Sequence, residues 1–205
     1  LSDKTESTPK TIWFHAISLG EVVGVTPTIR LLKKSRPQDR IVISVTTDSG
    51  FEAAKRKLPD VDSIFFFPLD CFVFTWTALK KIKPDLFVLV ETGFWPGFIH
   101  LLHLKGVPIL LFNGRISSRS MRKYKMFSSF FSKQFNRFTI LCIQNPHSKN
   151  KLESLGVEKS RLIVVGDPKF DVLPNPSQEE RGKTRQKLCI APLSMVWVAG
   201  STHEG

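Results

Sequence analysis

The chain has 205 residues, enough for one well-filled domain and the edge of a second. Hydrophobic residues make up 41% of it and charged residues 23%, which excludes a disordered chain and is typical of a globular fold. Lysine and arginine number 30 against 18 aspartates and glutamates. The resulting net charge of +12 favours an anionic partner, such as nucleic acid, an acidic membrane face or a phosphorylated substrate.

Cysteine usage and hydropathy exclude further classes. Cys71, Cys142 and Cys189 are far apart and form no CxxC pair, so the sequence supports neither a zinc site nor a disulfide framework, and we expect a reducing compartment. No apolar run reaches the roughly 18 residues that a membrane span needs, and we expect no signal peptide among these residues. Because the first residue is Leu1 rather than methionine, we expect that an N-terminal piece precedes it.

Seven short runs rich in β-branched and aromatic residues predict strands. Their continuous hydrophobicity is typical of parallel strands covered on both faces. They span residues 11–16, 40–46, 63–67, 85–90, 107–112, 138–143 and 161–165. Between them, longer amphipathic segments predict helices. These span residues 21–35, 51–58, 71–82, 96–104, 118–135 and 147–154, with Gly106 and Gly156 as expected C-terminal caps.

This alternation predicts a Rossmann-like, doubly wound α/β sheet over residues 11–170. Residues 168–178 contain three prolines and little periodicity, so residues 171–194 are predicted to be a linker followed by a charged helix. The run MVWVAG then predicts the first strand of a second domain, begun at residues 195–205.

Ligands of open parallel sheets bind outside the carboxyl ends of the strands, so the residues after each strand are candidates for a cleft. They are His15, Ser18, Gly20 and Glu21 after the first strand, Glu91 after the fourth, Asn113, Arg115 and Ser117 after the fifth, and Lys169 after the seventh. No full GxGxxG pattern follows the first strand, so no dinucleotide site is predicted. His100 and His103 lie three apart without a third ligand, which is typical of a helix surface rather than a metal site.

Glu21 opens a predicted helix, where the helix dipole favours an ionised carboxylate. Such a group can act as a general base at a cleft, or it can be a helix-start residue without chemistry. Glu91 directly follows a buried strand, where a carboxylate needs a partner. The segment 121–138 mixes basic and aromatic residues. It predicts an amphipathic core helix, with contact to anionic lipid as the second interpretation and nucleic acid as a distant third.

Five motifs in order resemble those of the 3-deoxy-manno-octulosonic acid (Kdo) transferases. IWFHAISLGEV resembles the family's W-x-H-x-x-S-x-G-E block, VETGFWPGFI its E-T-E-x-W-P-N block, and NGRIS its N-A-R-x-S block. VGDPKFD resembles its G-N-x-K-F-D block, and GSTHEG its G-S-T-H-x-G block. Gly93 and Gly97 depart from the second block, where they replace its second carboxylate and its asparagine, and Asp167 and Pro168 depart from the fourth.

The resemblance implies the N-terminal, acceptor-binding domain of a GT-B glycosyltransferase and the start of its donor-binding domain. It implies an inverting transfer of Kdo from CMP-Kdo to a lipid A precursor, a phosphorylated and acylated glucosamine disaccharide, in lipopolysaccharide biosynthesis. Glu21 would be the general base and no metal or other cofactor would be needed. The donor would contact Lys169, Gly200, Ser201, Thr202 and His203.

The resemblance also implies an enzyme at the cytoplasmic face of the inner membrane, with a hydrophobic anchor outside this chain. Arg122, Lys123, Lys133 and Arg137 would face the anionic membrane, and nucleic acid is not an expected partner. Because the donor domain is only begun here, this chain alone is expected to be inactive. Two alternatives are another GT-B glycosyltransferase and a non-catalytic Rossmann module that binds anionic lipid or nucleic acid; the second leaves the motif order unexplained.

Overall fold

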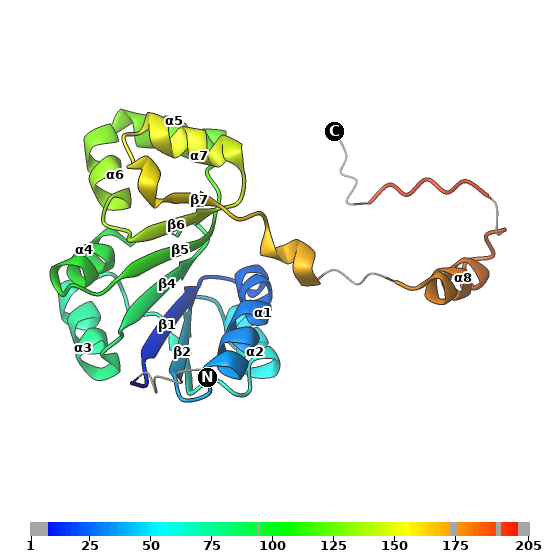
Figure 1. The fold of residues 1–205 in the computed structure, drawn as a ribbon, viewed down its shortest axis with the longest axis horizontal. Helices are drawn as coiled ribbons and strands as arrows, with labels where there is room; N and C mark the ends of the chain where they lie inside the picture. Colours follow the sequence, from blue (N-terminus) through cyan, green and yellow to red (C-terminus); the bar gives the residue numbers. More distant parts are fainter. Residues whose placement is uncertain (1–7, 94, 173–175, 192–193, 201–205) are drawn as a thin grey trace, which may run out of the picture. The chain divides into compact units, whose positions relative to one another are not determined.

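The computed structural model describes residues 8–93, 95–172, 176–191 and 194–200. The chain divides into two compact units, Leu1–Val172 and Leu173–Gly205. The first contains a sheet of seven parallel strands in the order β3-β2-β1-β4-β5-β6-β7 (Figure 1). The strands are β1 (Thr11–Ala16), β2 (Arg40–Val45), β3 (Ser63–Phe66), β4 (Leu86–Val90), β5 (Ile109–Gly114), β6 (Ile140–Ile143) and β7 (Leu162–Val164). The predicted doubly wound parallel sheet is therefore confirmed.

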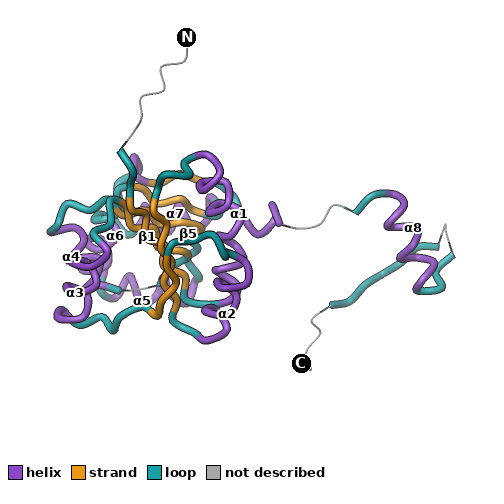
Figure 2. The backbone as a smooth tube through the Cα atoms, turned by 90° about the horizontal axis from the view of Figure 1, so that it is seen from below, coloured by secondary structure: helices purple, strands orange, loops and turns teal. Residues whose placement is uncertain are grey.

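Helices cover the two faces of this sheet. Figure 2 shows α1 (Leu19–Ser35) and α2 (Asp48–Lys57) on one face, and α3 (Phe72–Ile82), α4 (Pro96–Leu104) and α6 (Ser128–Phe135) on the other. The first unit also contains α5 (Ser118–Met126), α7 (Pro146–Ser154) and two short 3-10 helices, η1 (Lys159–Arg161) and η2 (Pro168–Val172). The second unit contains α8 (Gln178–Lys187). None of the described helices is long and apolar enough to cross a bilayer.

The apolar residues form one core on each side of the sheet. On the α3–α4 side the fully buried Trp13 contacts four phenylalanine rings at centroid distances of 5.0–6.0 Å. On the α1–α2 side, Val22, Val25 and Ile29 lie on one stripe of α1 and pack on β1 and β2. Gly106 and Gly156 end their helices with φ of 68° and 87°, the left-handed backbone that glycine adopts most easily.

Two predicted elements differ in the structure. The single helix expected over 118–135 is two helices, because Phe127 (φ −123°, ψ 46°) leaves the helical region. In one straight helix Tyr124 and Phe131 would lie about 10 Å apart along the axis. The break brings their ring centroids to 4.3 Å. The strand expected at 195–200 is absent, because residues 194–200 pair with no other described strand and most of their apolar side chains are exposed.

Candidate active site

The candidate site lies at the carboxyl ends of β1, β4 and β5, beside the point where the strand order reverses between β1 and β4. Glu21 comes from the first turn of α1, Glu91 directly follows β4, and Asn113 is the last residue but one of β5. Lys169 reaches the same place from η2. The structure thus brings together four candidates from segments far apart in the sequence.

Glu21 is a buried carboxyl group, 9% exposed. The backbone N–H of Ile17 donates a hydrogen bond to its Oε2 at 2.6 Å. Burial raises the pKa of Glu21 from 4.5 to about 7, against the opposing effect of the Ile17 hydrogen bond, and Glu91 raises it while Lys169 lowers it. A carboxyl group in this range is partly ionised near neutral pH and can accept a proton there.

Glu91 is held by an ion pair and by its backbone. Lys169 Nζ lies 2.7 Å from Glu91 Oε1, and this hydrogen bond raises the pKa of Lys169 above its ordinary value. Asn113 Nδ2 is 3.5 Å from the same oxygen, a long and weak contact. Glu91 and Asn113 have φ of 59° and 58°, a left-handed backbone that is unfavourable for residues other than glycine. Strain of this kind on two adjacent strands is typical of functional positions.

His15, predicted as a cleft residue, is near the end of β1 and is fully buried. Its ring stacks on Phe67 at 3.9 Å and lies edge-on to Trp95 at 5.4 Å. Nδ1 is within 3.2 Å of the Ser44 carbonyl and 3.1 Å of the Ser44 hydroxyl. Burial lowers the pKa of His15 to about 4, so the imidazole is neutral at physiological pH and is suited to shaping the site rather than to carrying charge.

The other predicted residues of the cleft lie at its border. Ser18 is the N-cap residue of α1 and makes no capping hydrogen bond with its side chain, and Gly20 is exposed in the first turn. Ser117 caps α5 through its hydroxyl, which accepts from the backbone N–H of Ser120 at 3.0 Å. Arg115 is exposed, and its backbone carbonyl accepts from the Thr92 hydroxyl at 2.8 Å.

The five residues expected to contact the donor belong to two different units of the chain. Lys169 lies in the first unit, paired with Glu91. Gly200 is exposed in the second unit without regular structure, and Ser201, Thr202 and His203 lie outside the described residues. Among the described residues, no three His, Cys, Asp or Glu side chains gather where they could hold a metal ion, and His100 and His103 are exposed on α4.

Asp70 is a residue whose role sequence analysis missed. Its carboxylate accepts from the backbone N–H groups of Gly97 at 3.1 Å and Phe98 at 2.7 Å, and so caps the start of α4. A Cβ at position 97 would lie 2.8 Å from Asp70 Oδ1, which explains the glycine there. A Cβ at position 93 would lie 2.8 Å from Ile17 Cδ1, so Gly93 also suits its surroundings. No local pattern could predict a cap 27 residues away from its helix.

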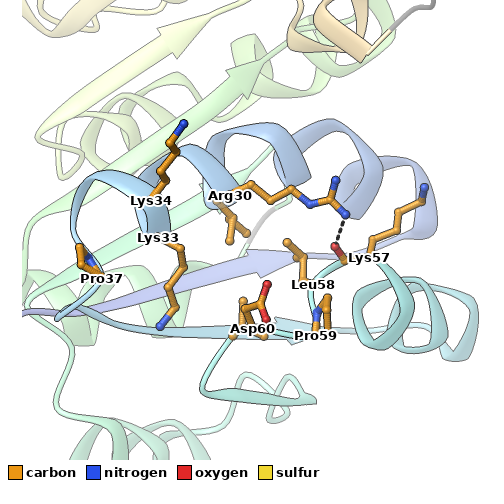
Figure 3. A pocket seen from close by; sticks show the side chains of 10 residues that line it. Arg30, Lys33, Lys34, Pro37, Lys57, Leu58, Pro59 and Asp60 are labelled. Atoms are coloured by element: carbon orange, nitrogen blue, oxygen red, sulfur yellow. Dashed lines mark hydrogen bonds between the residues drawn. The ribbon is translucent and has the colours of Figure 1, made fainter.

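A separate pocket of about 470 Å³ lies at the opposite edge of the sheet, near the amino ends of β2 and β3 (Figure 3). Its basic side chains do not converge on one point. Arg30 Nη2 donates to the Lys57 carbonyl at 2.8 Å, Lys33 pairs with Asp62 at 2.7 Å, and Lys34 points away from the pocket. The strand ends that carry Glu21 and Glu91 are therefore the better candidate site.

Comparisons with known proteins identify the type of fold and the family. In solved structures, the fold resembles UDP-GlcNAc 2-epimerase of Neisseria meningitidis (TM-score 0.57, 12% identity, 87% of this chain and 54% of that one). It also resembles MurG of Acinetobacter baumannii (TM-score 0.52, 13% identity, 83% and 47%). These likenesses show a Rossmann-like domain of the GT-B glycosyltransferase type.

Sequence relatives are more specific. Over 96% of this chain's length, it is 28% identical to the 3-deoxy-D-manno-octulosonic acid transferase of Haemophilus influenzae. Over 94% of this chain's length, it is 31% identical to that of Rickettsia felis. It spans 46% and 40% of those two proteins. The family model described as 3-deoxy-D-manno-octulosonic-acid transferase matches residues 1–172. The chain therefore belongs to the 3-deoxy-D-manno-octulosonic-acid transferase family.

Proposed function

We propose that this chain is the acceptor-binding half of an inverting glycosyltransferase that moves Kdo from CMP-Kdo to a lipid A precursor. The observation that carries the proposal is the buried Glu21 carboxyl group, with a pKa raised to about 7, beside the Glu91–Lys169 ion pair at the switch point of the sheet. In a chain of this family, that arrangement provides a base for a sugar hydroxyl and a positive charge for a phosphate.

In the proposed step, Glu21 removes the proton of the attacking acceptor hydroxyl. The hydroxyl oxygen forms a bond to the anomeric carbon of Kdo while the bond from that carbon to the CMP phosphate oxygen breaks. CMP leaves with the bonding electrons, and the configuration at the anomeric carbon inverts because attack and departure are on opposite faces. A base with a pKa near the working pH combines a useful ionised fraction with adequate basicity.

Lys169 and Glu91 have the supporting role in this proposal. An ammonium group has three hydrogen-bond donors, and the ion pair with Glu91 Oε1 uses one of them. The remaining donors are available to a phosphate of the donor or the acceptor, because the Lys169 side chain is 46% exposed. Glu91 fixes the ammonium group close enough to Glu21 to affect its pKa.

The donor assay tests this function. The full-length protein is expected to turn over CMP-Kdo, and not other nucleotide sugars, with a lipid A precursor as acceptor. The 205-residue chain alone is expected to show no turnover, because we propose that the donor binds mainly on the second domain, which begins at residues 195–205. Turnover by this chain alone would show that the proposed domain division is wrong, and transfer from another nucleotide sugar would indicate a different GT-B enzyme.

We also propose that α5 and α6 contact an anionic membrane at the cytoplasmic face of the inner membrane, where the lipid acceptor would be. Arg122, Lys123 and Lys133 are exposed, near the exposed Met126, Phe127 and Phe130. Arg137, predicted to be a fourth membrane-facing residue, is instead partly buried, and burial lowers its pKa. It follows α6 where the chain turns into the buried Phe138, so its side chain lies against the protein.

Changing Arg122, Lys123 and Lys133 to Gln is expected to weaken co-sedimentation with anionic liposomes. Each basic residue near such a surface contributes roughly 1 kcal/mol at low salt, so the effect of three should be readily measured and should fade as salt rises. Lys34, Lys55 and Arg56, exposed on α1 and α2, are the matched control with the same loss of charge. Equal binding of the parent chain to neutral and anionic vesicles would count against membrane contact through these residues.

A further inference from the structure

The loop between β1 and α1, which leads to Glu21, is held by the neighbouring junction between β2 and α2. β1 and β2 pair in parallel with Ala16 opposite Val45, so the residues that follow the two strands leave the sheet side by side. α1 and α2 then lie next to each other on one face of the sheet (Figure 2). The β2–α2 junction therefore borders the candidate active site, although the proposed transfer step uses none of its residues.

Ile17 is the residue at which the two junctions meet. Its carbonyl oxygen accepts from the backbone N–H groups of Thr46 at 3.3 Å and Thr47 at 3.2 Å. The Thr47 hydroxyl donates to the same oxygen at 3.2 Å. Each of these distances is long for a hydrogen bond, so the carbonyl is held by the three donors together rather than by any one of them.

The backbone N–H of Ile17 binds Glu21, donating to Glu21 Oε2 at 2.6 Å. Burial has the largest effect on the pKa of Glu21 and raises it, and the Ile17 hydrogen bond is the largest effect that lowers it. The charged groups that also act on this pKa are Glu91, which follows β4 and raises it, and Lys169, on η2, which lowers it. A movement of Ile17 would therefore change both the orientation of the Glu21 carboxylate and its pKa.

Thr47 is itself fixed as the N-cap residue of α2. Its hydroxyl oxygen accepts from the backbone N–H of Gly50 at 3.2 Å. Because a hydroxyl group has one proton and two lone pairs, it can donate to Ile17 and accept from Gly50 at the same time. One side chain thus joins the start of α2 to the loop that leads to Glu21. Valine has nearly the same shape but can make neither hydrogen bond.

Gly50 allows α2 to approach this loop closely. A Cβ at position 50 would lie 3.1 Å from Thr47 Oγ1, 3.4 Å from the carbonyl carbon of Ser18 and 3.5 Å from the Ile17 oxygen. The first of these distances is tighter than an ordinary contact, so even a methyl group there would press on the Thr47 hydroxyl. The first turn of α2 is therefore packed directly on the peptide that follows Ile17.

We propose that Thr47 is a positioning residue for the catalytic base, because it holds the Ile17 carbonyl and so fixes the N–H group that orients the Glu21 carboxylate. The inference rests on the proposed function, since a positioning residue matters to the reaction only if the group that it orients takes part. The effect of Thr47 on the Glu21 carboxylate can be measured without turnover. A failure of this contact is therefore distinguishable from a failure of the transferase proposal.

An NMR titration of the 205-residue chain tests the contact. Its glutamates are labelled with ¹³C, and the Glu21 signal is assigned by its loss in Glu21→Gln. In Thr47→Val, the titration midpoint of Glu21 is expected to rise by about half a pH unit or more, because the Ile17 hydrogen bond that favours the ionised form is weakened. Thr47→Ser keeps the hydroxyl and should restore the parent midpoint.

Thr139→Val is the matched control for a general loss of stability. Thr139 precedes β6 at the opposite edge of the sheet, and its hydroxyl oxygen accepts from the backbone N–H of Ile109 at 3.2 Å. Both valine variants lose a hydrogen bond between a side chain and the backbone, so both are expected to melt about 2–4 °C lower. Only Thr47→Val should move the Glu21 midpoint. An equal movement in both variants would show a general loosening of the fold and would overturn the proposal.

The full-length enzyme tests the consequence for the reaction. Thr47→Val is expected to lower kcat by about 10- to 100-fold, with little change in the KM for CMP-Kdo, because a misplaced base acts on the chemical step. The rise of turnover with pH should also move to higher pH, by as much as the Glu21 midpoint moves. A merely structural role would lower turnover at every pH without moving this profile. Thr47→Ser should have nearly the parent profile.

An unchanged Glu21 midpoint in a folded Thr47→Val chain would overturn the proposal, because Thr47 would then have no influence on the carboxylate. If Thr47→Val does not fold, Gly50→Ala tests the same contact from α2 and should also raise the midpoint. An unchanged midpoint in Gly50→Ala would be equally contrary. A raised midpoint together with parent turnover in the full-length enzyme would leave the contact in place but remove the catalytic role of both Glu21 and Thr47.

Discussion

Glu21→Gln is expected to lower the turnover of the full-length enzyme by about 100- to 10,000-fold, the usual contribution of a general base. In the parent, the Ile17 N–H donates a hydrogen bond to Glu21 Oε2 at 2.6 Å. Glutamine has the same size and can still accept this hydrogen bond, but it cannot take a proton from the acceptor hydroxyl. In the parent enzyme, turnover should rise with pH through about 7 as Glu21 loses its proton, and the variant should lack this rise.

Binding of CMP-Kdo, measured by calorimetry, is the control, because we propose that the donor is held mainly by the other domain. It should change little in the Glu21→Gln variant. If Glu21 were only a helix-start residue, the rate would remain nearly intact. A variant that retains more than about a tenth of the parent turnover has not lost its general base. Glu91, the other carboxylate at this edge, would then be the next candidate.

The sheet could be predicted from the sequence because a parallel strand covered on both faces is hydrophobic at every position. The seven runs match the seven strands to within two residues at each end. The break at Phe127 could not be predicted in this way. Local periodicity favours one continuous helix, and the contact of Tyr124 with Phe131 that requires the break is tertiary. Likewise, residues 195–200 have the hydrophobicity of a strand but no described neighbour to pair with.

Sequence analysis located the edge of the sheet at which the candidate site lies, but it did not predict the contacts there. The sequence predicts that Glu91 needs a partner, and the resemblance implies that Lys169 contacts the donor; their ion pair joins residues 78 positions apart. The burial of His15 depends on Phe67 and Trp95, which arrive from two other loops. The type of a residue and its position after a strand therefore identify it as a candidate for the site. The charge state of that residue and its hydrogen-bond or ion-pair partners depend on which loops the fold brings together.

The difference in stability between Glu21→Gln and its parent should depend on pH in a way that separates the two interpretations of this residue. Below about pH 4.5 the carboxyl group is protonated in both the unfolded and the folded chain, so the parent and the variant should be similarly stable. Between about pH 4.5 and 7 the unfolded chain releases the proton while the folded chain retains it, so the parent loses stability as pH rises. Glutamine does not titrate, and the variant keeps its stability.

The difference in the free energy of unfolding should therefore favour the variant by roughly 1–3 kcal/mol at pH 8, measured by urea denaturation of the 205-residue chain. If Glu21 were an exposed residue at the helix start, the difference in the free energy of unfolding would have the opposite sign. An ionised carboxylate would then stabilise α1 through the helix dipole by about 0.3–1 kcal/mol, and glutamine would remove that effect. Glu52→Gln, an exposed change on α2, is the matched control and should show little dependence on pH. A Glu21→Gln chain less stable than its parent at pH 8 would show that the site does not hold Glu21 as a desolvated base.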